Sequence, residues 1–210
     1  MRYAIGDIHG EYDKLRNLID ILDKDATEYI FLGDYIDKGK DSDKVIDFLL
    51  LKEGNKYKQQ KITLLMGDHE YMWTKLFIDT HDREAREFLL HYGGDKTFAS
   101  LKSVYDYYNF KYFLFRLLFY YETPDYFCVH AGIKNGEPDY FVRDEFINSK
   151  ELYHGKRVIF GHTAFKKPYI DDYKIGIDTG AVYPDMGLLT AYNLDTGEFV
   201  YHDGRKEMIN

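Results

Sequence analysis

Short apolar segments recur along the chain, and each runs into a loop that contains glycine and is rich in aspartate and histidine. We expect strands at Arg2–Ile5, Glu28–Leu32, Lys61–Met66, Tyr126–Val129 and Arg157–Phe160. Between the first three, apolar residues recur at the spacing of one buried helical face, at Leu15, Leu18, Ile19 and Leu22 and again at Val45, Ile46, Leu49 and Leu50. This alternation of strand and helix predicts an α/β core with parallel strand pairing.

The middle and the tail of the chain have different patterns. From Tyr71 to Asn109 the apolar residues are spaced by acids and bases in a way that predicts helices. In the tail, Lys174–Ile177, Leu188–Leu194 and Glu198–Tyr201 read as strands, with the turn of a hairpin at residues 195–197. We therefore expect a second, antiparallel sheet stacked on the first. The length of 210 residues and the lack of repeats or linkers predict one domain over residues 1–210.

Aromatic residues make up 18% of the chain, and Tyr105–Tyr121 is the segment richest in them. Such a segment could stack a substrate, but packing of helices against a sheet explains it too, and we expect a core segment. The single cysteine, Cys128, lies in the apolar run Tyr126–Val129 and is expected to be buried.

The formal net charge is −8, which argues against a nucleic acid polymer or an anionic membrane as a partner. An anionic substrate would therefore need a local source of positive charge, such as a metal cluster. No signal peptide is visible, and no apolar stretch approaches the ~20 residues of a membrane span. These features predict a cytoplasmic protein. The oligomeric state does not follow from the sequence.

Six residues of metal-ligating types lie in the loops after the five strands. They are Asp7, His9, Asp34, Asp68, His130 and His162. Strand ends in open α/β sheets converge on a shared crevice, so these groups are expected to meet at one rim. Carboxylates and imidazoles packed together without a counter-ion would repel one another and resist desolvation. Mixed nitrogen and oxygen ligands without a thiolate favour Mn, Fe or Zn over Ca. The pattern thus predicts a site for divalent metals.

The loop sequences are Gly-Asp-Ile-His-Gly at 6–10, Gly-Asp-Tyr-Ile-Asp-Lys-Gly at 33–39, Gly-Asp-His-Glu at 67–70, Val-His-Ala-Gly at 129–132 and Gly-His-Thr at 161–163. In this order they resemble the signature of the calcineurin-like metallophosphoesterases. The closer resemblance is to the phosphoprotein phosphatase branch, in its compact bacterial and phage form. It extends from Met1 to about Leu194, with lesser matches at 92–97, 141–144 and 177–182.

The resemblance implies a β-sandwich of two mixed sheets flanked by helices, with a dinuclear metal site at the C-terminal ends of the strands. Asp7 and His9 would bind the first metal, Asp34 would bridge both, and Asp68, His130 and His162 would hold the second. The cofactors would be two divalent ions, with Mn²⁺ preferred and Fe or Zn as alternatives. Two metals roughly 3.5–4 Å apart can generate a bridging hydroxide for in-line attack on phosphorus.

The resemblance also implies roles for side chains that do not bind metal. His69 would be the general acid that protonates the leaving oxygen, and Asp37 would orient it. Arg143 matches an arginine that grips the phosphate, although a salt bridge to Asp144 or Glu145 is an alternative reading.

Three positions depart from the pattern of the branch. Lys38 and Met66 stand where arginine is usual, so at Lys38 a bidentate phosphate contact becomes a point charge. Asp68 stands where the branch has asparagine. These departures leave three hypotheses. The first is a serine/threonine-type protein phosphatase acting on a phosphorylated protein. The second is a hydrolase of a small phosphoanhydride. It would cleave diadenosine tetraphosphate symmetrically or hydrolyse another polyphosphate. The third is a metal-binding protein with low turnover because of Asp68.

Overall fold

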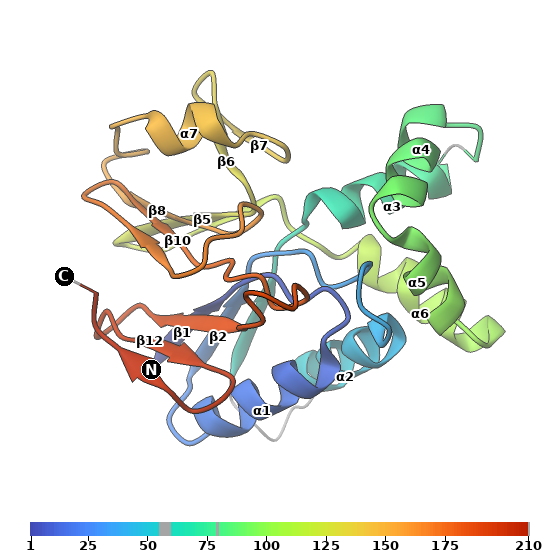
Figure 1. Ribbon diagram of the computed structural model, residues 1–210, viewed down its shortest axis with the longest axis horizontal. Coiled ribbons are helices and arrows are strands. Elements are labelled where there is room, and N and C mark those ends of the chain that lie inside the picture. Colours follow the sequence, from blue (N-terminus) through green and yellow to red (C-terminus); the bar gives the residue numbers. More distant parts are fainter. Residues whose placement is uncertain (55–59, 79, 210) are drawn as a thin grey trace.

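The computed structural model describes residues 1–54, 60–78 and 80–209, which form two β-sheets packed face to face with helices on their outer faces (Figure 1). The first sheet has the strand order β13-β12-β11-β1-β2-β3. Its strands are β1 (Arg2–Ile5), β2 (Glu28–Phe31), β3 (Lys61–Leu64), β11 (Thr190–Asn193), β12 (Phe199–Tyr201) and β13 (Lys206–Glu207). Strands β1, β2 and β3 are parallel, and β11 runs antiparallel to β1.

The second sheet has the order β4-β5-β8-β10-β9. Its strands are β4 (Tyr120–Glu122), β5 (Tyr126–Val129), β8 (Arg157–Phe160), β9 (Tyr169–Ile170) and β10 (Lys174–Gly176), and a separate hairpin is formed by β6 (Gly132–Lys134) and β7 (Glu137–Asp139). Strands β5, β8 and β10 are parallel, while β4 and β9 pair antiparallel at the edges. Both sheets are therefore mixed, which confirms the α/β sandwich that the resemblance implies.

The prediction that the tail forms a second, antiparallel sheet is wrong. The hairpin of β11 and β12 forms around residues 195–197, but it extends the first sheet. Arg2 fixes it there, because its backbone carbonyl accepts from the N–H of Leu194 and its Nε donates to Asp195 Oδ1 over 2.7 Å. Strand β10 instead lies parallel to β8. A strand pattern predicts which face is buried but not which strand is the neighbour, because pairing is decided by distant contacts.

Successive side chains of a strand point to opposite faces of its sheet. One face of each central strand therefore packs against helices, and the opposite face packs against the other sheet. In β1, Tyr3 and Ile5 pack with α1 (Tyr12–Leu22) and α2 (Ser42–Gly54), whereas Ala4 points to the core between the sheets. Helix α1 buries the face predicted from its periodicity. On the far side of the sandwich, Phe146 of α7 (Asp144–Asn148) packs on the outer face of the second sheet.

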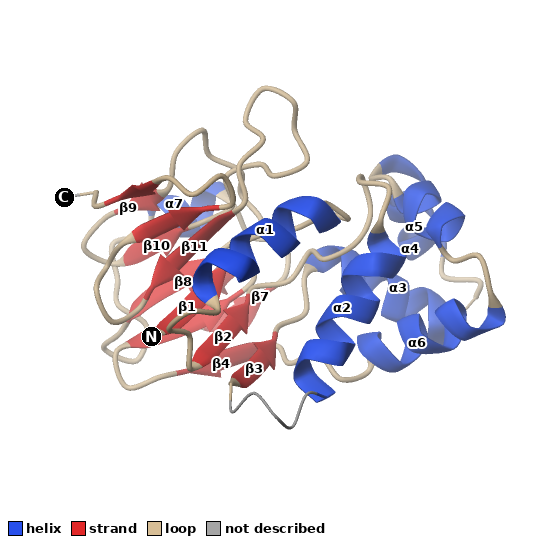
Figure 2. Cartoon of the chain, turned by 90° about the horizontal axis from the view of Figure 1, so that it is seen from below, coloured by secondary structure: helices blue, strands red, loops and turns tan. Residues whose placement is uncertain are grey.

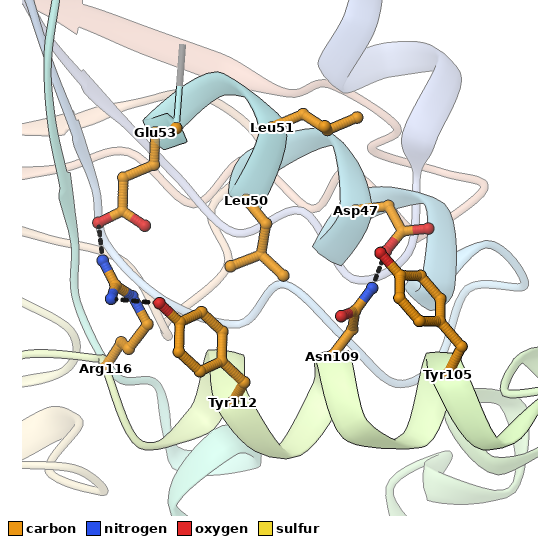
Figure 3. A pocket seen from close by; sticks show the side chains of 9 residues that line it. Asp47, Leu50, Leu51, Glu53, Tyr105, Asn109, Tyr112 and Arg116 are labelled. Atoms are coloured by element: carbon orange, nitrogen blue, oxygen red, sulfur yellow. Dashed lines mark hydrogen bonds and ion pairs between the residues drawn. The ribbon is translucent and has the colours of Figure 1, made fainter. Parts of the chain in front are cut away.

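A group of helices projects from the side of the sandwich (Figures 1 and 2). It contains α3 (Asp68–Ile78), α4 (Arg83–His91), α5 (Gly94–Ser100) and α6 (Val104–Leu114), which confirms the helical prediction for the middle of the chain. Helix α6 and the residues after it face α2 across a groove of about 380 Å³ (Figure 3). Two polar pairs link its walls, with Arg116 Nη2 2.7 Å from Glu53 Oε1 and Asn109 Nδ2 3.0 Å from Asp47 Oδ1.

The prediction that Tyr105–Tyr121 is a core segment is wrong for most of its aromatic residues. In α6 only Phe110, Phe113 and Leu114 are buried, and Tyr108 is 65% exposed. The reason is that α6 packs on its neighbours along one face only, so its other faces remain in water. Cys128 is fully buried in the core between the sheets, as predicted. No helix within the described ranges has the length and apolar character needed to cross a lipid bilayer.

Candidate metal centre and active site

The C-terminal ends of parallel strands from both sheets meet at one place, between the sandwich and the helical group. The loops after β1, β2 and β3 and those after β5 and β8 bring five of the six predicted ligands, together with His69, into two groups. Within each group the ligand atoms lie within 4.8 Å of one another. One group is Asp34, Asp68, His130 and His162, and the other is His9, Asp34 and His69. All these side chains are buried. Asp34 belongs to both groups, which is the position that a bridging ligand needs.

The histidines are oriented by the backbone. Nδ1 of His9 lies 2.8 Å from the carbonyl oxygen of Ile36, and Nδ1 of His130 lies 2.9 Å from that of Leu32. A carbonyl can only accept, so each Nδ1 carries a proton and each Nε2 faces the cluster. His162 presents the other nitrogen, with Nδ1 3.1 Å from Asp68 Oδ1. Its Nε2 is buried and has no hydrogen-bond partner among the described residues.

Asp7 is brought to the site but belongs to neither group. Its Oδ2 accepts a 2.9 Å hydrogen bond from the backbone N–H of His162. Burial raises the pKa of Asp7 well above its usual value, and the charges of Asp178 and Asp34 add to this. The position therefore calls for a cation. Asp178 was part of a matched segment in the sequence, but no role was predicted for it.

The electrostatics of the cluster also fit a divalent cation. Burial works against ionisation of Asp34, but the charges of His130, His69 and His9 hold its pKa well below the usual value. Burial likewise lowers the pKa of His130, yet Asp34 and Asp68 outweigh it and raise that pKa to about 10. The carboxylates are thus stable as anions only beside positive charge. The donor set is carboxylate and imidazole, which suits Mn, Fe or Zn.

Backbone conformation sets this region apart from the rest of the chain. Among the described residues, seven non-glycine residues have positive φ, and five of them belong to the site: His9, Asp34, Asp37, Lys38 and His162, with φ between 47° and 66°. Such residues persist only where the surroundings hold them in place, and they cluster at functional sites. At these five positions the packing of the site, rather than the intrinsic preference of the residue for negative φ, determines the backbone conformation.

Two glycines allow the loops to approach the carboxylates. A Cβ on Gly67 would collide with Asp34, and a Cβ on Gly161 would collide with Asp7. Neither glycine has positive φ, so close approach rather than conformation is what requires it.

We expect Gly161→Ala to weaken metal retention about 10- to 100-fold, the usual range for losing support of a ligand. The added methyl group must displace the Asp7 carboxylate. Dialysis followed by elemental analysis measures the effect. Gly54→Ala is the matched control, because a Cβ there meets nothing within 4 Å and φ is ordinary. Equal retention in the two variants would contradict the prediction.

Glu70 ties two of the loops together. Its carboxylate accepts backbone hydrogen bonds of 2.9 Å from Asp34, 2.9 Å from Tyr35 and 3.0 Å from Gly67. Burial, followed by the charge of Asp34, raises the pKa of Glu70 to about 8. Glu70 lies in the Gly-Asp-His-Glu motif at 67–70, but the motif alone predicts no role for it. It holds the backbone on both sides of the cluster.

His69 and Asp37 form a buried pair, with His69 Nδ1 2.7 Å from Asp37 Oδ2. The other oxygen of Asp37 accepts from Trp73 Nε1 over 3.0 Å and from Thr97 Oγ1 over 2.6 Å. Burial lowers the pKa of His69, but Asp34 and the bond to Asp37 outweigh it and raise the pKa. The ring is thus held with Nε2 towards the cluster. Sequence reasoning missed Trp73 and Thr97, although Trp73 is the only tryptophan and Thr97 ends a matched segment.

Two cationic side chains border the site. Arg143 Nη1 donates to the carbonyl oxygen of His162 over 2.9 Å. Within the described part of the chain, Arg143 does not form the alternative ion pair with Asp144 or Glu145. Lys38 Nζ lies 2.7 Å from His9 Nε2 and 5.6 Å from the ring centre of Tyr183. Burial lowers the pKa of Lys38, but the nearby carboxylates, Asp34 first, outweigh it and raise the pKa.

These groups surround one cavity of about 210 Å³. Its lining contains two acids, two imidazoles, two cations and four aromatic side chains. The lining residues are Asp34, Lys38, Asp68, His69, Phe88, Tyr92, Phe141, Arg143, His162, Ala164 and Tyr183. The cavity is smaller than the groove between α2 and α6. Chemistry rather than size distinguishes it.

Comparison with known proteins gives a family and relatives. The family model described as calcineurin-like phosphoesterase matches residues 3–184. The chain is 31% identical over 144 residues to the serine/threonine-protein phosphatase 4 catalytic subunit of Saccharomyces cerevisiae, a match that covers 67% of this chain and 40% of that protein. The chain thus spans less than half the length of this curated relative.

Solved structures share the fold at low sequence identity. A cold-active protein-tyrosine phosphatase of a psychrophilic Shewanella species has a TM-score of 0.71 at 14% identity, covering 100% of this chain and 80% of that one. A putative diadenosine tetraphosphatase has a TM-score of 0.65 at 20% identity, covering 95% and 91%. With the family match spanning all five motif loops, the chain belongs to the calcineurin-like phosphoesterase family.

Proposed function

We propose that this chain is a two-metal phosphoprotein phosphatase that uses the chemistry of the serine/threonine type. The observation that carries the proposal is a buried cluster of ligand-type side chains beside the His69–Asp37 pair, next to a cavity that Arg143 also lines. The cluster consists of His9, Asp34, Asp68, His130 and His162. The similarity to a protein phosphatase catalytic subunit supports the same choice.

The proposed cofactors are two divalent ions, with Mn²⁺ preferred. Asp7, His9 and Asp34 would hold one, and Asp34, Asp68, His130 and His162 the other. When bound, such ions activate water and stabilise charge on the phosphoryl oxygens. The ionised carboxylate of Asp34, which is buried and needs positive charge beside it, supports this assignment.

The side chains of the protein supply the proton and the orientation. Nδ1 of His69 is held by Asp37, so Nε2 is the atom that can give a proton to the leaving oxygen. Trp73 and Thr97 hold Asp37 in turn, which fixes the direction of the ring. Because Asp37 is completely buried, water does not compete for these bonds.

Arg143 and Lys38 are proposed to bind the phosphate. Arg143 uses Nη1 on the carbonyl of His162, which leaves the rest of its guanidinium for phosphate oxygens. Lys38 Nζ lies within the cluster and offers a point charge. Both line the cavity.

A second candidate function is hydrolysis of diadenosine tetraphosphate or a related polyphosphate. The structural likeness to a putative diadenosine tetraphosphatase covers nearly all of both chains. The aromatic lining of the cavity offers rings on which a nucleobase could stack. The metal chemistry would be the same, so only the substrate separates the two functions. A metal-binding protein with low turnover, because of the extra charge of Asp68, is the third possibility.

A substrate panel tests the choice. Protein loaded with Mn²⁺ would be assayed on phosphopeptides, p-nitrophenyl phosphate, diadenosine tetraphosphate and tripolyphosphate. Faster hydrolysis of the phosphopeptides supports the proposed function, and faster hydrolysis of the dinucleotide supports the second candidate. No turnover on any substrate, with metal bound, supports the third.

We expect loading with Mn²⁺ to give about two equivalents of metal per chain, as a two-metal site requires. Elemental analysis after gel filtration measures the stoichiometry. Asp34→Asn should retain less metal, because Asp34 belongs to both ligand groups. Metal contents near zero in both wild type and variant would remove the basis of the proposed function.

A further inference from the structure

Four aromatic side chains line the active-site cavity and are more exposed than the proposed metal ligands. We call Phe88, Tyr92, Phe141 and Tyr183 the aromatic rim. Phe88 is half-buried, while Tyr92 is 46%, Phe141 40% and Tyr183 37% exposed. The rim is thus the part of the cavity that a substrate meets between solvent and the buried cluster.

Three of these rings form a continuous wall on the His69 side. The ring centre of Phe88 is 5.2 Å from that of His69, 4.6 Å from that of Tyr92 and 6.3 Å from that of Phe141. Phe88 belongs to α4, in the helical group of Figure 1, and Phe141 precedes Arg143. Tyr183 lies apart from this wall, beside Lys38.

The depth of the cluster limits which phosphate esters can reach it. Among the proposed ligands the most exposed is His162, at 6%, so a reacting phosphorus must lie below the rim. In phosphoserine only an oxygen and one methylene separate phosphorus from Cα, so the peptide backbone would have to enter the cavity. In phosphotyrosine a flat ring occupies that length, and the backbone can remain outside.

The direction of the leaving group brings that ring against the wall. If His69 protonates the leaving oxygen, the carbon bonded to this oxygen lies next to the His69 ring and therefore next to Phe88. Aromatic rings prefer offset or edge-to-face neighbours with centres 4.5–7 Å apart. The same spacing already relates Phe88 to His69, Tyr92 and Phe141.

We propose that the aromatic rim selects aryl phosphate monoesters, so that the chain takes phosphotyrosine side chains in preference to phosphoserine. This inference rests on the proposed phosphatase function and narrows its substrate. In the reaction the oxygen of water bonds to phosphorus while the bond from phosphorus to the phenolic oxygen breaks. The phenolic oxygen takes a proton, and inorganic phosphate leaves.

Paired peptides of one sequence, carrying phosphotyrosine or phosphoserine, give the first measurement. A phenol leaves more readily than an aliphatic alcohol, so a preference in the wild type alone is not sufficient. The decisive quantity is the change in the ratio of kcat/KM values when a rim ring is removed. Phe88→Leu, Tyr92→Leu and Phe141→Leu should each lower the ratio about two- to tenfold. Phe98→Leu, at an exposed position outside the cavity lining, should leave it unchanged.

Binding of phosphonates gives a second measurement without any leaving group. Calorimetry on the Mn²⁺-loaded protein should show tighter binding of phenylphosphonate than of methylphosphonate, and the difference should shrink in Tyr92→Leu. Tyr92 and Phe141 are exposed enough to be replaced without opening the core, so these variants guard against misfolding of Phe88→Leu.

The outcomes separate this inference from the proposed function. Equal binding of both phosphonates and an unchanged peptide ratio in the rim variants would overturn the inference while hydrolysis of both peptides continued. Rim variants that slow only diadenosine tetraphosphate hydrolysis would overturn it too, because the rings would then bind a nucleobase. Loss of all hydrolysis with metal bound would overturn the proposed function, and the phosphonate ratio would still decide the role of the rim.

Discussion

Replacement of His69 by alanine is expected to lower kcat about 10²–10⁴-fold, the usual contribution of a general acid. Asp37 holds Nδ1 of the His69 ring, which leaves Nε2 to protonate the leaving oxygen. Metal content should be unchanged if His69 transfers a proton. The geometry also groups His69 with His9 and Asp34, so metal content is the measurement that distinguishes an acid from a ligand.

The dependence on the leaving group sharpens this test. The loss should be large for a phosphoserine peptide, whose alkoxide needs a proton, and small for p-nitrophenyl phosphate, whose leaving group is a weak base. Asp37→Asn should reproduce part of the loss, because the orientation of the ring depends on it. His154→Asn is the control, since His154 is 57% exposed and lies outside the cavity lining, and asparagine tolerates its positive φ. Equal losses for good and poor leaving groups would contradict the role.

The parts of the site that the sequence predicts are those carried by local pattern. A strand followed by a Gly-Asp or Gly-His loop identifies the end of the strand and the chemistry on it within a few residues. The loops that follow these strands converge because parallel strands end at the same edge of a sheet. This pairing holds for β1, β2 and β3 and for β5 and β8. Asp34 and His130 come from different sheets and still lie 3.4 Å apart, between Oδ1 and Nε2.

The parts that could not be predicted depend on contacts between distant segments. Trp73 reaches Asp37 from α3, and Thr97 reaches it from α5, because the helical group packs against the loop after β2. The aromatic rim likewise combines Phe88 with Phe141, more than fifty positions apart. A pattern shows that such residues are aromatic or polar, but packing decides which of them face a cavity.

Asp68 is the one proposed metal ligand that departs from the pattern of the branch, and its environment keeps it charged. Burial and the charge of Asp34 oppose ionisation, but hydrogen bonds from His130 and His162 lower the pKa of Asp68. Its Oδ1 lies 3.0 Å from His130 Nε2 and 3.1 Å from His162 Nδ1. An asparagine would keep an oxygen donor at this point without the negative charge.

Replacement of Asp68 by asparagine is therefore expected to raise kcat/KM at least tenfold at saturating Mn²⁺. One negative charge about 5 Å from a phosphate costs on the order of 3 kcal/mol at an effective dielectric constant of about 20, or roughly a hundredfold in rate. Carboxylate binds metal more strongly than amide, so the variant should also lose metal faster on dialysis. Asp68 would thus lower the catalytic rate and raise the affinity for metal. Asp125→Asn is the control for a change of net charge, because that side chain is 68% exposed. A variant that is less active at saturating metal would show instead that the ionised carboxylate is needed, through its bonds to His130 and His162, to hold the site in its working geometry.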